Sequence, residues 1–163
     1  MASLSSVSSA LLLRPFQAGD AEAFRTLNEE WIAANFGLEE KDHTTLRDPD
    51  GQILRPGGAI FMAITGHTAI GCCALIPIEP GVYEVAKMAV ERSHRGFGVG
   101  RKILEYTIAQ ARARGATRLY LETNKTLLNA IHLYESVGFR HLPPERVTPS
   151  PYARANVFME MVL

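Results

Sequence analysis

Cysteine is scarce in this 163-residue chain, which has only Cys72 and Cys73. Neighbouring residues of a strand point to opposite faces, so these two thiols are not expected to form a disulfide with each other. The sequence has no Cys-x-x-Cys pair and no His/Cys spacing typical of zinc. We therefore expect no metal site, two cysteines in the apolar core, and a reducing, cytoplasmic location.

Long apolar runs and a net charge are also absent from the sequence. The chain has 17 basic and 17 acidic residues, and the apolar stretch near its start covers only Ala10–Leu13. That stretch is too short for a signal peptide or a membrane span. We expect residues 1–9 to form a disordered, Ser-rich tail and residues 10–163 to form a single domain. Neither a nucleic-acid partner nor a membrane partner is expected.

The neutral total hides a regional contrast in charge. Nine acidic residues face three basic ones between Asp20 and Asp50, whereas seven basic residues face one acidic residue between Arg92 and Arg118. Solvated helix faces would account for any single charge. Taken together, the contrast suits a protein that binds a polyanionic cofactor on one side and meets a cationic partner on the other.

The order of hydrophobic patterns and turn residues predicts an α/β chain with a mixed sheet. Asp20 is expected to cap the first helix, and the sequences Asp48–Gly51 and Pro77–Gly81 are expected to form turns. In chain order we expect strand 11–14, helix 20–36, helix 39–47, strands 59–64, 69–76 and 83–90, helix 99–114, strand 118–122, helix 127–137, and strands 139–141 and 156–161.

The most informative stretch is the loop Arg95–Arg101, RGFGVGR, between a strand and a long amphipathic helix. Gly96, Gly98 and Gly100 allow positive φ values and leave no Cβ in the way of a ligand. The helix start that follows presents unpaired N–H groups and the positive end of the helix dipole. Because an arginine stands at each end, the loop predicts a diphosphate-binding site.

Two motifs together resemble those of the GCN5-related N-acetyltransferases, the GNAT superfamily. Arg95–Gly100 is similar to the family's Gln/Arg-x-x-Gly-x-Gly/Ala signature, and Ala130–Phe139, AIHLYESVGF, is similar to its A-x-x-L-Y-E-x-x-G-F pattern. The resemblance spans about residues 11–163 and is weakest before Gly58 and after Pro143. It implies a mixed, mostly antiparallel central sheet of six to seven strands, flanked by about four helices, whose central strands splay apart.

The resemblance also implies an activity and a cofactor. The chain would transfer an acetyl group from acetyl-CoA to a primary amine of a small molecule or peptide, by direct attack in a ternary complex. Many relatives pair as dimers, so a homodimer stays open. The residues expected to contact the cofactor are Met88, Ala89, Val90, Arg95, Gly96, Phe97, Gly98, Val99, Gly100, Arg101 and Asn124.

Two other functions compete with this interpretation. A non-catalytic acyl-CoA-binding module on the same fold would keep the loop but turn over no amine, and fold alone does not exclude it. A dinucleotide-binding fold is suggested by Gly96-Phe97-Gly98 after a strand. However, position 101 is Arg where the dinucleotide fingerprint has its third glycine.

Two residues are candidates for catalysis. Tyr134 matches the tyrosine that protonates the departing CoA thiolate in many family members, although its place on an apolar helix face also fits a core role. Glu84 lies where some members carry a glutamate base. A lysine-type amine has a pKa of about 10.4, so a base must remove its proton near neutral pH. Strand alternation predicts one face with Glu84, Ala86 and Met88 and the other with Val85, Lys87 and Ala89.

The remaining expected contacts concern the cofactor and the acceptor. Leu127 stands where the family often has a cofactor-binding Asn, and we expect Asn124 (with Asn129 as the alternative) to replace it. By resemblance, Trp31 and Arg154 would border the acceptor site. The acidic residues between 29 and 42 favour a cationic amine, whereas Arg154 would favour an acceptor with a carboxylate, such as an amino acid or a peptide end.

Overall fold

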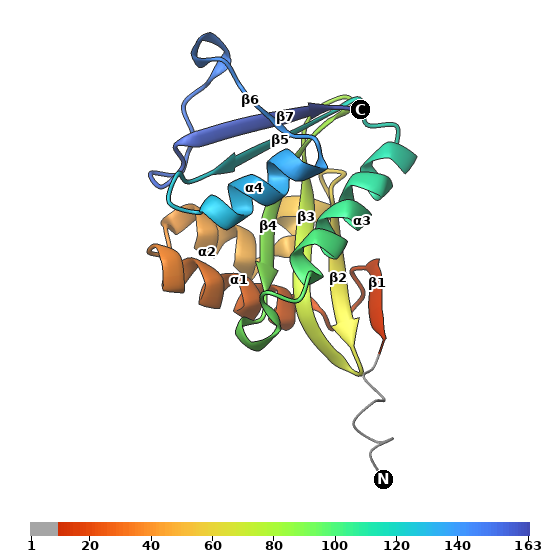
Figure 1. The fold of residues 1–163 in the computed structure, drawn as a ribbon. Helices are drawn as coiled ribbons and strands as arrows, with labels where there is room; N and C mark the ends of the chain where they lie inside the picture. The colour runs from red at the N-terminus through yellow and green to blue at the C-terminus, as the bar shows by residue number, and fades with distance from the viewer. Residues whose placement is uncertain (1–9) are drawn as a thin grey trace.

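The computed structural model describes residues 10–163, so the tail expected for residues 1–9 lies outside the described residues. The described residues form one seven-stranded sheet in the order β1-β2-β3-β4-β5-β7-β6 and four α-helices (Figure 1). The predicted mixed α/β fold is confirmed. The strands are β1 (Leu11–Pro15), β2 (Ala59–Thr65), β3 (Thr68–Glu79), β4 (Val82–Val90), β5 (Arg118–Thr123), β6 (Arg140–His141) and β7 (Val157–Val162). The α-helices are α1 (Ala21–Asn35), α2 (Glu40–Arg47), α3 (Val99–Ala113) and α4 (Leu128–Val137).

The two central strands, β4 and β5, are the one parallel pair of this sheet and separate after three residue pairs. Val82 pairs with Arg118, Tyr83 with Leu119, and Glu84 with Tyr120. Beyond Glu84, β4 continues to Val90 without a partner on its β5 side. In Figure 1, β5 and β7 run across the direction of β1–β4. The predicted splay of the central strands is therefore confirmed, and it leaves backbone N–H and C=O groups of β4 facing the gap.

Apolar side chains alternate along the strands and build one cluster on each face of the sheet. α3 packs on one face through Ile103, Leu104 and Ala111, while α1 and α2 cover the other face through residues such as Phe24 and Leu46. Both faces of the sheet are apolar and must be covered, and each helix has only one apolar stripe with which to cover a face.

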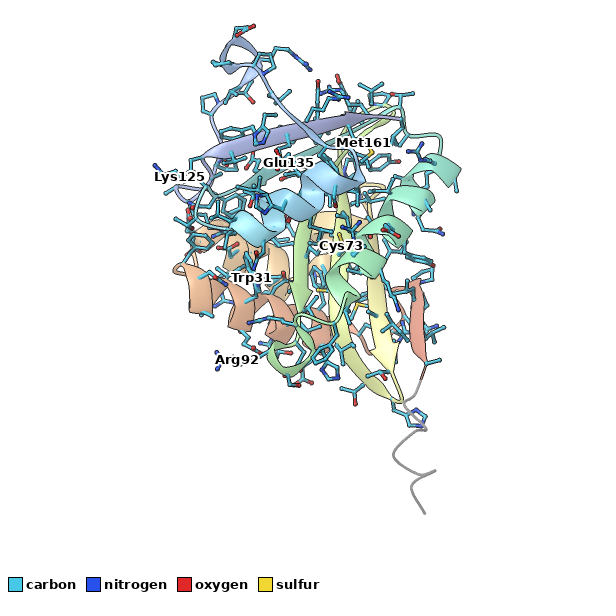
Figure 2. All side chains as sticks on the ribbon, viewed as in Figure 1. Trp31, Cys73, Arg92, Lys125, Glu135 and Met161 are labelled. Carbon is cyan, nitrogen blue, oxygen red and sulfur yellow. The ribbon has the colours of Figure 1, made fainter. Side chains whose placement is uncertain are left out.

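The two cysteines lie in different clusters, as alternation predicts. Cys73 lies in the α3 cluster and Cys72 in the α1/α2 cluster, and both are fully buried. Figure 2 shows Cys73 inside the fold. Burial raises the pKa of each thiol to about 12. Their assignment to the core is confirmed.

Strand β4 contains a bulge that makes the predicted alternation wrong. Cys73 of β3 stands opposite two residues, Lys87 and Met88, because Cys72 pairs with Ala89 and Ala74 pairs with Ala86. Lys87 has a positive φ of 52°, which is unusual for a residue with a side chain. The bulge moves Met88 to the α3 face and Ala89 to the α1/α2 face.

Three local predictions also differ from the structure. The predicted turn at Asp48–Gly51 overlaps a π-helical segment, Asp50–Leu54. Strand β3 continues through Pro77 to Glu79, so the expected turn begins later. Asp20 stands at the start of α1 without capping it, because its carboxylate accepts hydrogen bonds from Arg14 and from the amide of Gln17.

Candidate active site

A cavity of about 240 Å³ opens where β4 and β5 separate. Its walls include Trp31 of α1 from one face of the sheet and Tyr134 of α4 from the other, so the cavity passes through the gap in the sheet. Six of the predicted site residues line it: Trp31, Glu84, Met88, Asn124, Tyr134 and Arg154. The splay of two strands therefore brings together residues far apart in the sequence.

Glu84 is the last residue of β4 that pairs with β5, so its carboxylate lies at the mouth of the gap. The side chain is half-buried, and it has no hydrogen-bond or ion-pair partner within residues 10–163. Burial raises the pKa of Glu84 to about 7, the nearby carboxylate of Glu122 adds to this, and Lys87 and Lys41 oppose it. A carboxyl group with a pKa near neutrality is suited to accept and release a proton.

Tyr134 enters the cavity from α4. Gly138 ends this helix with a φ of +116°, which allows the chain to turn so that the Phe139 ring meets Tyr134 edge to face at 6.1 Å between centroids. Burial raises the pKa of Tyr134 above its usual value, and the nearby Cys73 adds to the effect. The hydroxyl therefore keeps its proton at neutral pH.

A buried charge network forms the wall of the cavity beside α2. Asp42, which is fully buried, accepts hydrogen bonds of 2.7 Å from Lys87 Nζ and from both Nη atoms of Arg154. Tyr152 lies against both cations, with its ring centroid 4.8 Å from Lys87 Nζ and 4.4 Å from Arg154 Cζ. Burial acts to raise the pKa of Asp42, but the hydrogen bonds from Arg154 and Lys87 outweigh it and hold that pKa well below its usual range.

This network, in which Arg154 binds Asp42, was not predicted from the sequence. The family resemblance placed Arg154 beside the acceptor, with an acceptor carboxylate as one of two open partners, whereas its two Nη atoms face Asp42 and one of them also contacts Glu39 at 3.4 Å. The local sequence offered one clue: Glu39 and Asp42 form a reciprocal cap at the start of α2. Nothing local indicated that Lys87 would lie on the same face as Glu84.

Glu122 is a second carboxylate in the cavity that sequence reasoning did not assign to the site. Its oxygens accept hydrogen bonds from the hydroxyls of Tyr120 at 2.8 Å and Ser150 at 2.5 Å. Alternation along β5 was the available clue, because Leu119 and Leu121 are buried in the core and Glu122 must face the other way.

Asn124 and Trp31 line the cavity in different ways. The Asn124 amide donates to the carbonyl of Arg154 at 2.7 Å and accepts from the amide of Thr126 at 2.9 Å, so it ties the end of β5 to the connection before β7. Trp31 packs beside Phe36 with ring centroids 6.2 Å apart. The predicted contacts of Asn124 with the cofactor and of Trp31 with the acceptor stay predictions.

The glycine loop lies outside the lining of this cavity, after the end of β4. Gly96 and Gly98 have φ values of +85° and +82°, and a Cβ at either position would meet no atom within 4 Å. The amide of Lys102 bonds to the Gly98 carbonyl at 3.1 Å, so the first-turn amides before it have no helical acceptor. The loop therefore offers open backbone donors that fit a diphosphate.

The two arginines at the ends of the loop are held by other groups. Arg95 donates to the carbonyl of Val90 at 2.8 Å and reaches Glu30 at 3.5 Å. Arg101 donates to the Ser136 hydroxyl at 2.7 Å. Arg92, just before the loop, points out into solvent (Figure 2). Diphosphate binding by Arg95 and Arg101 stays a prediction.

Over residues 10–163, no group of three or more His, Cys, Asp or Glu side chains could hold a metal ion. Among the helices of the same residues, none combines the length and the apolar character that crossing a membrane requires.

Comparison with known proteins decides the family. Residues 22–139 match the model of the Acetyltransferase (GNAT) family. The chain belongs to the GNAT family. The GNAT resemblance and the assignment of the chain as an acetyltransferase are confirmed, and acetyl-CoA-dependent acetyl transfer is the general activity of this family.

Individual relatives of this GNAT acetyltransferase support the same family assignment. An uncharacterized N-acetyltransferase of Schizosaccharomyces pombe is 30% identical over 137 residues, which cover 81% of this chain and 83% of that protein. The IAA acetyltransferase of Azospirillum brasilense is 36% identical over 63% of each chain.

Solved structures share the fold. A GNAT-family acetyltransferase of Staphylococcus aureus Mu50 has a TM-score of 0.84 at 20% identity and covers 94% of this chain and 99% of its own. A Bacillus subtilis acetyltransferase in complex with CoA has a TM-score of 0.71 at 16% identity, with coverage of 94% and 99%.

Proposed function

We propose that this GNAT acetyltransferase transfers the acetyl group of acetyl-CoA to a primary amine of a small molecule or peptide, by direct attack within a ternary complex. The observation that carries the proposal is a single cavity that brings Glu84 and Tyr134 to the gap between β4 and β5. Trp31 and Ile32 line the cavity from the α1 side and Tyr134 lines it from the α4 side. Two substrates can therefore meet in the gap from opposite faces of the sheet.

The cofactor would lie along β4 and the glycine loop. The backbone of Met88–Val90 has no strand partner on its β5 side, so its polar groups on that side, apart from the Val90 carbonyl that accepts from Arg95, are available to pantetheine. The amides from Gly96 to Arg101 would hold the diphosphate. When bound there, acetyl-CoA supplies the thioester whose acetyl group is transferred.

The proton transfers follow from the two side chains in the cavity. Glu84 takes a proton from the acceptor ammonium, and the free amine attacks the thioester carbon. The new C–N bond forms as the C–S bond breaks, and Tyr134 gives its proton to the departing sulfur. A positioned base of this kind contributes roughly 10²–10⁴-fold to the rate, and holding both substrates in one cavity lowers the entropic part of the barrier.

The charges of the cavity favour a cationic acceptor over one recognised through its carboxylate. Glu84 and Glu122 both line the cavity, whereas the guanidinium of Arg154 already faces Asp42 through both of its Nη atoms. An acceptor carboxylate would have to compete with this buried pair. We therefore favour an amine that binds in its protonated form.

A non-catalytic acyl-CoA-binding module is the second candidate, and Glu84 argues against it. A half-buried carboxylate with no partner in the described part of the chain destabilises the fold, and its perturbed pKa inside a cavity is typical of functional sites. A binding module would gain nothing from such a group.

The test compares ligand binding and turnover in the wild type and in Gly98→Trp. Thermal-shift and calorimetric titrations with acetyl-CoA, CoA and NAD(H) are followed by an amine panel with detection of the released thiol. We expect acetyl-CoA to bind the wild type and not the variant, and at least one amine to be acetylated. Binding without turnover of any amine would indicate the binding module, and a wild type that binds neither CoA species would contradict the proposal.

A further inference from the structure

The two carboxylates of the cavity come from neighbouring strands and share one face of the sheet. Glu84 of β4 pairs with Tyr120 of β5, and strand alternation places Tyr120 and Glu122 on the same face. The hydrogen bond from the Tyr120 hydroxyl to Glu122 agrees with this placement. Glu84 and Glu122 therefore flank the point where the two strands separate.

Glu122 is fixed in position by its surroundings. Tyr120 donates to one carboxylate oxygen and Ser150 to the other, at 2.8 Å and 2.5 Å. The Ser150 hydroxyl in turn accepts the amide of Tyr152 at 3.0 Å. The backbone of Glu122 pairs with Phe158 of β7. The carboxylate is thus positioned from two elements and has little freedom to move.

Within residues 10–163, no ion pair neutralises Glu122, although the cavity wall contains three cations. Lys87 and Arg154 are paired with Asp42, and Lys41 lies on the exposed side of α2. Glu122 thus presents a positioned negative charge to the same cavity as the unpartnered Glu84. Among residues 10–163 neither carboxylate forms a salt bridge, and Lys87 and Lys41 act on Glu84 only at longer range, so the pair suits a ligand that carries a cation.

We propose that Glu122 binds the acceptor in its ammonium form beside Glu84, so that the site selects aliphatic primary amines over arylamines. Aliphatic amines are protonated at neutral pH and arylamines are not. This inference rests on the proposed function and divides the work between the two carboxylates. Both oxygens of Glu122 already accept hydrogen bonds, so Glu122 supplies charge and position. Glu84 has no such partner and receives the proton that leaves the ammonium nitrogen before the C–N bond forms.

Because Glu122 lies near the proposed base Glu84, its charge should also affect the pH dependence of the reaction. The groups that face Glu84 are Glu122 and Tyr120 of β5, Lys87 of β4, Lys41 of α2, and Tyr152 of the connection before β7. Burial is the main reason that the pKa of Glu84 is raised, and the negative charge of Glu122 raises it further. Removal of that charge must move the titration of Glu84 to lower pH.

The experiment measures steady-state kinetics of Glu122→Gln with matched alkylamines and arylamines, such as benzylamine and aniline. Loss of the attraction between the Glu122 carboxylate and the ammonium predicts a rise in KM for alkylamines of roughly 10- to 100-fold, with kcat within about threefold of the wild type. The acidic limb of kcat/KM should move to lower pH, and KM for arylamines should stay unchanged. Glu79→Gln, at an exposed residue outside the cavity, is the matched control and should change none of these values.

Several outcomes separate this inference from the proposed function. A wild type that acetylates amines while Glu122→Gln keeps its KM for alkylamines overturns the inference alone. Equal losses for alkylamines and arylamines also overturn it, because they indicate a structural role. A wild type that acetylates no amine overturns both.

If Glu122→Gln does not fold, Ser150→Ala is the second variant: it keeps the charge of Glu122 but removes one of the two hydrogen bonds that position its carboxylate. A KM increase confined to alkylamines then supports the inference, and an unchanged KM contradicts it.

Discussion

Three carboxylates within one small region behave differently because their neighbours differ. Asp42 is fully buried between two cations and stays ionised, whereas Glu84 is half-buried without a partner and titrates near neutrality. Glu122 is held by two hydroxyl groups. Residue type alone therefore does not define a role in this site, because burial and hydrogen bonding set the charge states of Asp42 and Glu84.

Glu84 is the proposed base, and its protonation should control the rate. Because the pKa of Glu84 is about 7, the ionised form increases as the pH rises through that value, and kcat/KM should rise with it and then level off. In Glu84→Gln this acidic limb should disappear, and kcat should fall by roughly 10²–10⁴-fold. A pH–rate profile of both proteins measures the effect.

The matched control is Glu79→Gln, which removes a carboxylate from the exposed end of β3. Its profile should overlay that of the wild type. If Glu84→Gln retains full activity with an unchanged acidic limb, another group is the base.

At the scale of elements, the cavity wall depends on contacts between α2, β4 and the connection that follows β6. Asp42 of α2 binds Lys87 of β4 and Arg154 of that connection. The bulge in β4 makes this contact possible, because it turns Lys87 to the α2 side of the sheet. Three elements distant in sequence are thereby held at the acceptor side of the gap.

We predict that Asp42→Asn lowers the free energy of unfolding by roughly 3–5 kcal/mol, because it leaves two buried cations without their carboxylate. The pKa of Asp42 is held below its unfolded value, so its stabilisation is fully present above about pH 4 and is lost as the pH falls through the folded value. The difference between variant and wild type should therefore shrink in acid. Urea unfolding at pH 7 and pH 3 measures it.

The exposed pair Asp50–Arg55 provides the comparison for this prediction, since its side chains are 57% and 79% exposed. Asp50→Asn should change the unfolding free energy by less than about 1 kcal/mol. Equal effects at Asp42 and Asp50 would show that the buried network contributes no special stability.

The glycine loop allows stability and cofactor binding to be separated. Gly98 has a φ of +82° with open space around its Cβ position, so Gly98→Ala should cost roughly 1–2 kcal/mol through backbone strain alone. Gly100 is helical, and the nearest atoms to its Cβ position lie at 3.9 Å, so Gly100→Ala should stabilise by up to about 1 kcal/mol. Thermal unfolding gives both values.

The affinity for acetyl-CoA should change differently from the stability in Gly98→Ala and Gly100→Ala. If the loop backbone contacts the diphosphate, both substitutions should weaken acetyl-CoA binding even though their effects on stability differ in sign. Calorimetry measures the affinity. Binding that follows stability, stronger in Gly100→Ala and weaker in Gly98→Ala, would contradict a direct contact.

At the scale of the whole molecule, the sheet separates two apolar clusters that contain one cysteine each. Both thiols are fully buried, and burial raises their pKa to about 12. We predict that a thiol reagent labels the native protein roughly a thousandfold or more slowly than the guanidinium-unfolded protein, because labelling requires unfolding. Mass spectrometry follows both sites.

The labelling rates also show whether the two apolar clusters open together or separately. Equal labelling rates at Cys72 and Cys73 under native conditions indicate that the clusters open together. Fast labelling of either thiol in the folded protein would contradict the burial of that cluster.

Much of the fold was predictable because its causes are local. Gly98 and Gly138 mark helix boundaries through positive φ values, and the apolar stripe of α3 follows its helical period. The bulge at Lys87 was not predictable, because it arises from the way β3 and β4 pair. The Asp42–Arg154 contact was equally hidden, since the two residues are 112 positions apart.

The sequence by itself determined the element order and the GNAT family motifs, and it predicted the glycine loop as a diphosphate site and Glu84 and Tyr134 as catalytic candidates. Tertiary structure alone decided that Glu84, Glu122 and Tyr134 meet in one cavity and that Arg154 faces Asp42. The physical reason is that propensity, capping and glycine geometry act over a few residues. Desolvation and ion pairing instead depend on which distant segments pack together, and these forces set the charge states of Asp42 and Glu84.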